Sequence, residues 1–198
     1  MLTKQQLLEP LARIRTNEVV VTTMGVVRPW GKLSSSDLDF ASADSAMGHA
    51  ADLSLGIAMA QPSRKVICLN GDGSMLMTLG TLVTIVESSV DNLILFVLVN
   101  GTYEITGNQR IPGEGTIDFA TMAEAAGFPR VYRFDDPHEY EESLEEMLRG
   151  NGPVFVSVTM ERGAEGPISR STAEESRYLQ TSLAEWARKF RAAMSVVD

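Results

Sequence analysis

The segment from Asn92 to Val99 reads Asn-Leu-Ile-Leu-Phe-Val-Leu-Val, an almost unbroken run of large apolar side chains. A strand with one face in water alternates apolar and polar residues, so this run predicts a strand that is covered on both faces. Such strands are typical of parallel sheets that have helices on either side. This segment therefore predicts a buried central strand in a layered α/β fold.

The rest of the chain alternates between strand-like and helix-like segments. The other predicted strands are Glu18–Thr23, Lys65–Asn70, Val131–Phe134 and Pro153–Thr159. The predicted helices are Lys4–Arg15 with a Thr3–Gln6 capping box, Met47–Ala60, Ser74–Ser88, Asp118–Ala126, a helix from Asp136–Pro137 to Gly150, and Thr172–Met194. The predicted loops are Gly25–Phe40, Gly101–Ile117 and Arg162–Ser171. This alternation predicts βαβ units in one domain over residues 1–198, with a doubly wound, mostly parallel sheet and helices on both faces.

The acidic composition narrows the classes of partner. The 198 residues include 17 Lys and Arg against 26 Asp and Glu, a net charge of −9, so we expect no nucleic acid partner. The single cysteine, Cys68, cannot form an internal disulfide or, from this chain alone, a Cys-rich zinc or iron–sulfur site. The N-terminus lacks the apolar core of a signal peptide, and no run of about 18 apolar residues could span a bilayer. We therefore expect a cytoplasmic protein with no membrane partner.

A carboxylate lies in the turn that follows the strand Lys65–Asn70. The turn reads Asn70-Gly71-Asp72-Gly73-Ser74, and ligands of doubly wound sheets bind beyond the carboxyl ends of strands. The glycines permit close approach of the backbone, and the free N–H groups of the next helix suit a phosphate. The Gly-Lys-Ser/Thr signature of a P-loop is missing, so the carboxylate of Asp72 would need a divalent cation such as Mg²⁺ between it and a polyphosphate. The alternative is an ordinary Gly-Asp-Gly turn without a ligand.

A second polar segment, Asn100-Gly101-Thr102-Tyr103, follows the apolar strand. Asn100 can offer an amide oxygen to the same cation, and Thr102 can offer a main-chain oxygen. An Asn-Gly pair by itself is usually only a turn. Asp72 and Asn100 are 28 positions apart, with one predicted helix between them, which is the crossover that a βαβ unit needs. The two segments are therefore expected at adjacent strand ends.

Together these segments resemble the motif of thiamine-pyrophosphate-dependent enzymes, in which Gly-Asp-Gly is followed at similar spacing by a pair of asparagines. The resemblance implies that Asp72, Asn100 and the main-chain oxygen of Thr102 hold Mg²⁺, which holds the pyrophosphate. It also assigns cofactor binding to Gly71, Gly73, Ser74 and Tyr103. The first asparagine of the usual pair is Val99 here, but the metal-binding one matches Asn100. The implied fold is the pyrophosphate-binding domain of these enzymes, in agreement with the βαβ pattern.

A third segment, Ser45-Ala46-Met47-Gly48, is similar to the Gly-Ser-Met-Gly segment of the same family. Met47 matches the apolar residue that wedges under the bent cofactor, and the main-chain oxygen of Ser45 would accept a hydrogen bond from its 4′-amino group. The alternative for Met47 is an ordinary core methionine. His49, two residues further, is a candidate catalytic acid–base residue, with a polar interface residue as the alternative.

The family activates its cofactor with a glutamate from a separate pyrimidine-binding domain. No second domain of that size is found here, and neither Glu9 nor Glu18 matches that residue. The resemblance therefore implies a hetero-oligomer with a pyrimidine-binding-domain subunit, together with self-association.

The segment Asn100–Gln109 narrows the resemblance to sulfopyruvate decarboxylase β subunits and phosphonopyruvate decarboxylases, although Glu104 replaces a usually small residue. The implied activity is decarboxylation of a small anionic 2-oxoacid, whether sulfonate, phosphonate or carboxylate. The alternatives are a subunit of another thiamine-dependent 2-oxoacid enzyme, acetolactate-synthase-like or an oxidoreductase, and a noncatalytic module with the same fold. A sulfonate or phosphonate group of the substrate would need an arginine, and four are candidates: Arg110, Arg162, Arg170 and Arg177. The alternative for each of them is a surface salt bridge, which is the more common role.

Overall fold

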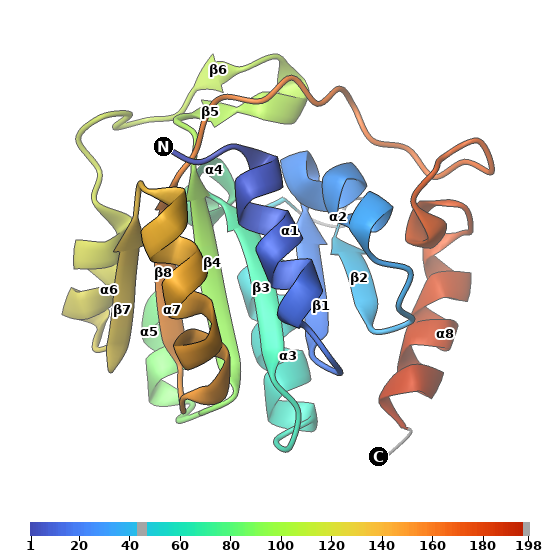
Figure 1. The fold of residues 1–198 in the computed structure, drawn as a ribbon, viewed down its shortest axis with the longest axis horizontal. Coiled ribbons are helices and arrows are strands. Elements are labelled where there is room, and N and C mark those ends of the chain that lie inside the picture. Colours follow the sequence, from blue (N-terminus) through green and yellow to red (C-terminus); the bar gives the residue numbers. More distant parts are fainter. Residues whose placement is uncertain (43–46, 196–198) are drawn as a thin grey trace.

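The computed structural model describes residues 1–42 and 47–195. Within these residues six strands form one sheet in the order β2-β1-β3-β4-β8-β7, and every neighbouring pair is parallel (Figure 1). The strands are β1 Val19–Thr23, β2 Asp39–Ser42, β3 Val66–Gly71, β4 Leu93–Val99, β7 Arg130–Phe134 and β8 Val154–Thr159. The predicted doubly wound parallel sheet is therefore confirmed, with β2 as a strand that the sequence did not reveal.

Helices cover both faces of this sheet (Figure 1). On one face α1 (Lys4–Ile14) packs against α2 (Val27–Leu33) and α7 (Pro137–Arg149). On the other face α5 (Thr81–Glu87) packs against α3 (Ala50–Ala60) and α6 (Phe119–Ala126). The remaining elements are α4 (Asp72–Met77), α8 (Leu183–Met194), the short antiparallel pair β5 (Thr102–Tyr103) and β6 (Gln109–Arg110), and three 3₁₀ turns, η1 (Met24–Val26), η2 (Glu104–Thr106) and η3 (Arg177–Leu179).

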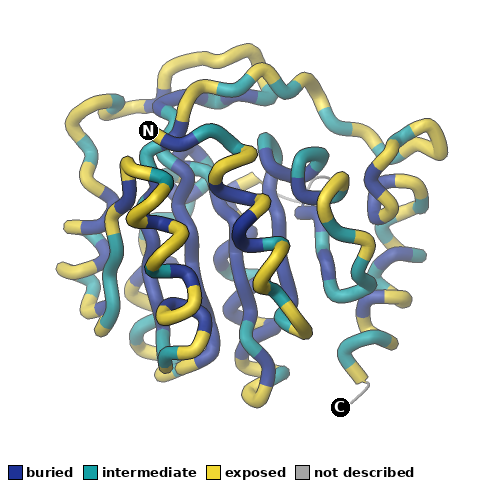
Figure 2. The backbone as a smooth tube through the Cα atoms, viewed as in Figure 1, coloured by how far each residue is buried: buried dark blue, intermediate teal, exposed yellow. Residues whose placement is uncertain are grey.

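The core lies between these layers, and the central strands are buried along most of their length (Figure 2). The residues of β4 from Leu93 to Val97 are 0% exposed, as the apolar run predicts. Cys68 on β3 is also fully buried, and burial raises the pKa of its thiol to about 12. It therefore behaves as a small core residue.

Local capping signals in the sequence are confirmed. Thr3 and Gln6 form the capping box of α1, and Asp118 caps α6 by accepting a hydrogen bond from the Thr121 amide. Gly127 ends α6 in the left-handed conformation, and Pro137 is the first residue of α7. These features depend only on residues within one turn, so the sequence identifies them directly.

The segment Gly25–Phe40 is not the loop that its Gly, Pro and Ser content predicts, because it contains α2 and the start of β2. Pro29 lies in the first turn of α2, where a missing N–H costs no intrahelical bond. Trp30 in the same helix is fully buried. Burial of the Trp30 side chain therefore favours a helix here, although the Gly, Pro and Ser content of the segment favours a loop.

Three predicted helices differ from their predicted bounds. Ser74–Ser88 is interrupted between α4 and α5, where the Thr78 hydroxyl donates to the Gly48 carbonyl at 2.5 Å. The C-terminal helix begins at Leu183, because the residues before it cross to α2, with Glu174 2.8 Å from the Arg28 guanidinium. The predicted helix Met47–Ala60 begins at Ala50, and the predicted loop Gly101–Ile117 includes β5 and β6.

The order of the strands decides where a ligand can bind. After β1 the chain adds β2 on one side, and then adds β3 and β4 on the other. The loops that leave β1 and β3 therefore diverge, and a crevice opens between them at the carboxyl ends. Figure 1 shows β5, β6 and the segment after β8 above this edge. Among the described residues, no helix is both long and apolar enough to cross a membrane.

Candidate functional site

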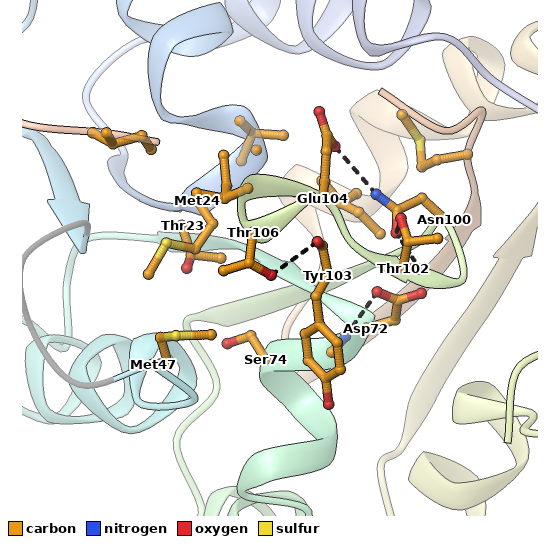
Figure 3. A pocket seen from close by; sticks show the side chains of 18 of the residues that line it. Thr23, Met24, Met47, Asp72, Ser74, Asn100, Thr102, Tyr103, Glu104 and Thr106 are labelled. Carbon is orange, nitrogen blue, oxygen red and sulfur yellow. Dashed lines mark hydrogen bonds between the residues drawn. The ribbon is translucent and has the colours of Figure 1, made fainter. Parts of the chain in front are cut away.

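A cavity of about 550 Å³ lies at the carboxyl edge of the sheet. Segments that follow β1, β2, β3, β4 and β8 line it, together with Lys4 from the first turn of α1. Figure 3 shows Asp72 and Asn100 on one side of this cavity and Met47 on the other. Its position agrees with the crevice that the strand order predicts.

Asp72 joins the two predicted motifs. Its carboxylate accepts one hydrogen bond from its neighbour Gly73 and one from the Gly101 amide beyond β4, each at 2.7 Å. The side chain is buried, and burial raises the pKa of its carboxyl group, while the N–H groups of Gly101 and Gly73 lower it in part. An ionised Asp72 is thus stabilised by dipoles but has no cation paired with it among the described residues.

Asn100 is held next to this carboxylate with a defined orientation of its amide. Its oxygen Oδ1 accepts from the Thr102 amide at 2.9 Å, and its Nδ2 donates to Glu104 at 3.2 Å. Thr102 is buried and lines the cavity. The structure therefore brings the three residues of the expected metal site to one wall.

The Gly-Asp-Gly-Ser turn carries two further signs of a ligand site. A Cβ atom on Gly71 would meet no atom within 4 Å, whereas one on Gly73 would lie 2.5 Å from the ring of Tyr103. Gly73 therefore makes room for Tyr103, and Gly71 leaves open space at the cavity wall. The hydroxyl oxygen of Ser74 is buried and has no hydrogen-bond partner among the residues that the structure describes. Such a group is a donor left available for an acceptor such as a phosphate oxygen.

This donor set fits a hard divalent cation bound to phosphate. It combines one carboxylate, one amide oxygen, an available hydroxyl and open backbone at Gly71. Across the described residues no group of three or more His, Cys, Asp and Glu side chains could hold a metal. A cation here would therefore complete its shell with oxygens of the phosphate groups and water.

Met47 lies at the opposite side of the cavity, and its alternative interpretation as a core residue is wrong because 44% of it is exposed. Gly48 after it has a φ of +90°, and a Cβ atom there would lie 2.8 Å from the Cβ of Met77. Glycine at this position therefore allows the chain to turn closely over α4. Ser45 lies outside the described residues.

His49 precedes α3 and is more than half exposed. Its Nδ1 lies 2.6 Å from a carboxylate oxygen of Asp52, and the other oxygen of that carboxylate accepts from the hydroxyl of Thr81. His49 is adjacent to cavity residue Gly48 but is not itself among the described lining residues. Its catalytic role stays a prediction.

Three parts of the cavity were not predicted from the sequence: Lys4, the segment Thr23–Val26 at the carboxyl end of β1, and the segment after β8 that includes Ile168. Met24 has a φ of +40°, which is uncommon outside glycine and concentrates at functional sites. Its position directly after a buried strand is the signal that could have found it.

The arginines considered for substrate binding lie outside the described lining of the cavity. Arg110 and Arg162 both pair with Glu114, and Arg177 pairs with Asp37 at 2.9 Å. Arg170 donates to the carbonyls of Tyr178 and Thr181. The contacts of Arg110, Arg162 and Arg177 agree with the salt-bridge alternative.

Comparisons with known proteins agree with this geometry. Residues 34–158 match the family model described as "Thiamine pyrophosphate enzyme, C-terminal TPP binding domain". The chain is 36% identical to the sulfopyruvate decarboxylase subunit beta of Methanothermobacter thermautotrophicus, over 88% of this chain and 91% of the relative. It is 33% identical to the phosphonopyruvate decarboxylase of Streptomyces viridochromogenes, over 92% of this chain but only 43% of that longer relative.

A solved structure shows the same fold. The benzoylformate decarboxylase of Polynucleobacter necessarius matches with a TM-score of 0.65 and 20% identity, over 81% of this chain and 33% of that one. At this identity the likeness concerns the fold alone.

We predict that Asp72→Ala abolishes cofactor-dependent activity and the stabilisation that Mg²⁺ and thiamine pyrophosphate give together, because the cation loses its anionic ligand. A ligand at 100 times its Kd stabilises the wild type by about 2.7 kcal/mol, which thermal unfolding with the partner subunit present can measure. The matched control is Asp118→Ala, which removes a helix cap outside the cavity and should keep the ligand-induced shift. A normal shift and normal turnover in Asp72→Ala would rule out the metal assignment.

Proposed function

The chain belongs to the thiamine pyrophosphate enzymes through their C-terminal cofactor-binding domain, and on this premise we propose that it is a subunit of a Mg²⁺-dependent 2-oxoacid decarboxylase of the sulfopyruvate or phosphonopyruvate type. The observation that carries the proposal is the hydrogen bond from Gly101 to Asp72, which unites the two motifs beside the cavity. The hydroxyl of Ser74 on the same wall, which has no partner within residues 1–42 and 47–195, supports it. In this proposal residues 1–198 form one domain of a cytoplasmic enzyme.

Each residue has a distinct part in this proposal. Asp72, Asn100 Oδ1 and the main-chain oxygen of Thr102 hold Mg²⁺. The hydroxyl of Ser74 and the open backbone at Gly71 receive the diphosphate, which Mg²⁺ neutralises, while Gly73 lets Tyr103 pack against the same turn. When bound, the cofactor supplies the electron sink for loss of CO₂ from a 2-oxoacid.

The apolar side chain of Met47 supports the ring end of the cofactor. It lines the cavity on the side away from Asp72, whereas Tyr103 lines the cavity beside Gly73 (Figure 3). In this proposal the main-chain oxygen of Ser45 accepts a hydrogen bond from the 4′-amino group of the pyrimidine ring. These contacts orient the cofactor and exclude water from it.

The activating glutamate comes from a pyrimidine-binding-domain subunit in this proposal. The relative from M. thermautotrophicus, matched over nearly its whole length, is itself named a subunit. Large apolar side chains are exposed around the cavity mouth and on the adjoining helices: Met47, Met59, Met77 and Val83. Exposed apolar surface of this kind, rich in methionine, is typical of protein interfaces.

The charge of the cavity lining also supports a partner subunit. The described lining of the cavity holds three carboxylates, Asp72, Glu104 and Glu161, and one ammonium group, Lys4, which pairs with Glu104 at 2.5 Å. A small anionic 2-oxoacid carries a second acidic group that needs its own cationic partner. We propose that the partner subunit donates this cation.

We predict that the complex of both subunits, with thiamine pyrophosphate and Mg²⁺, converts sulfopyruvate or phosphonopyruvate to CO₂ and the corresponding aldehyde. The assay measures both products with each subunit alone and together. Turnover by this chain alone would contradict the partner's role. Carboligation or reduction of an electron acceptor would favour the other thiamine-dependent enzymes, and absence of cofactor binding by calorimetry would favour a noncatalytic module.

We predict that Met47→Ala lowers kcat of the complex by roughly 10- to 100-fold, because the cofactor loses its apolar support and a small misplacement of reacting atoms is costly. The free energy of unfolding should change by no more than about 0.5 kcal/mol, since the side chain is exposed in the free chain. Leu33→Ala is the matched control, because Leu33 is 41% exposed on α2 outside the cavity. If unfolding explains the whole loss in Met47→Ala, the wedge role is wrong.

We predict that His49→Gln lowers kcat by about 10²- to 10⁴-fold and removes one limb of its pH profile, because the imidazole then no longer transfers a proton. Cofactor affinity and subunit association should stay unchanged. The control is His138→Gln, since His138 is an exposed histidine on α7 paired with Glu142. Weaker subunit association with an unchanged pH profile would instead assign His49 to the interface.

A further inference from the structure

Glu104 is a buried carboxylate in the cavity wall for which the proposed function has no use. Its side chain is 5% exposed, although it belongs to the short 3₁₀ turn η2 that follows β5. One oxygen, Oε1, accepts from Lys4 at 2.5 Å and from the Glu165 amide at 2.9 Å. The other oxygen, Oε2, accepts from Nδ2 of Asn100 at 3.2 Å. The carboxylate thus connects the loop after β4, where Asn100 lies, to α1 and the segment after β8.

Two glycines from distant parts of the chain make room for this carboxylate. A Cβ atom on Gly25, after β1, would lie 2.8 Å from Oε2 of Glu104. A Cβ atom on Gly163, after β8, would overlap Oε1. Neither glycine has a positive φ, so their small size, rather than backbone conformation, is what the site uses. The arrangement is a slot that fits one carboxylate.

A direct metal-binding role for Glu104 is the obvious alternative, but its contacts disfavour it. The ammonium group of Lys4 already balances the charge of Glu104, and the side-chain amide of Asn100 donates to its other oxygen. Asp72, in contrast, accepts hydrogen bonds only from backbone N–H groups among the described residues. The two carboxylates of the cavity therefore have different roles.

We propose that Glu104 is a positioning residue that sets the orientation of the Asn100 amide, so that its oxygen serves the metal. An asparagine amide carries an oxygen on one side and an N–H donor group on the other. Glu104 accepts from the donor side at Nδ2, and the Thr102 amide donates to Oδ1 at 2.9 Å, so the two contacts together keep the oxygen on the side of the group away from Glu104. A flipped amide would present N–H groups to a cation. Outer partners of this kind commonly tune metal affinity. The inference rests on the proposed function, because the metal is the Mg²⁺ proposed there.

The same carboxylate also fixes one wall of the cavity. By accepting from the Glu165 amide it holds the segment that carries Pro167 and Ile168, both of which line the cavity. Asn108 supports this segment by donating to the Gly163 carbonyl at 3.0 Å. Loss of Glu104 should therefore disturb the metal ligand and the apolar wall together.

The test measures Mn²⁺ affinity of the complex with its partner subunit in the presence of thiamine pyrophosphate, by electron paramagnetic resonance of the free ion. We expect Glu104→Ala to weaken Mn²⁺ binding by roughly 10- to 100-fold, the usual effect of removing such a partner. Added Mg²⁺ should restore much of its activity, which it would not do for a folding defect. Glu104→Gln should also weaken binding, because its amide group must face one of the N–H donors now bound by the carboxylate.

Gly163→Ala provides a second variant in which the charge is unchanged but the carboxylate is displaced, and it should weaken Mn²⁺ binding in the same direction. The matched control is Glu124→Gln, which breaks a pair with Arg133 outside the cavity and should leave Mn²⁺ affinity unchanged. If Glu104→Ala fails to fold, the Mn²⁺ affinities of Glu104→Gln and Gly163→Ala decide the result.

The outcomes separate this inference from the proposed function. Wild-type Mn²⁺ affinity in both Glu104→Gln and Gly163→Ala would overturn the positioning role while leaving the enzyme assignment intact. A wild-type complex that does not bind Mn²⁺ with thiamine pyrophosphate would overturn the proposed function, and the positioning role with it.

Discussion

The cavity depends on the alignment of β3 and β4, which Asp72 secures by accepting the Gly101 amide. The parallel register pairs Gly71 with Leu98, so the two strands reach the same edge of the sheet together. A shift of one residue would turn the following side chains to the other face. Because β4 is buried on both faces, that register is strongly fixed. The position of Asp72 beside Asn100 therefore follows from the packing of the central sheet.

Charge pairing distinguishes the two buried carboxylates near the cavity. Glu104 is paired with Lys4 and accepts two further hydrogen bonds, so it is already neutralised within the chain. Asp72 has only backbone donors among the described residues, and burial raises the pKa of its carboxyl group. A charge left without a counter-ion in a buried site is the one that a cation stabilises most. Their different surroundings are the reason for proposing Asp72 as a metal ligand and Glu104 as a positioning residue.

The exposed rim of the cavity has the composition of an interface. Met47 and Met77 are each 44% exposed beside an open cavity in a chain whose central strands are fully covered. When a second protein surface covers such apolar side chains, their removal from water is favourable and stabilises the complex. The acidic lining of the cavity adds a need for positive charge from outside. Both features support a shared site, which is the arrangement proposed for the enzyme.

The sequence by itself determined the layered fold, most strand positions, the helix caps, and the motif residues around Asp72 and Asn100. These features depend on near neighbours: a period of apolar residues, a cap within one turn, or a polar residue directly after a buried strand. Only the tertiary structure decided that Gly25–Phe40 contains α2, and that Lys4 and Glu104 meet 100 positions apart. Such contacts depend on which helix end packs over which strand, and packing of distant segments leaves no periodic signal in the local sequence.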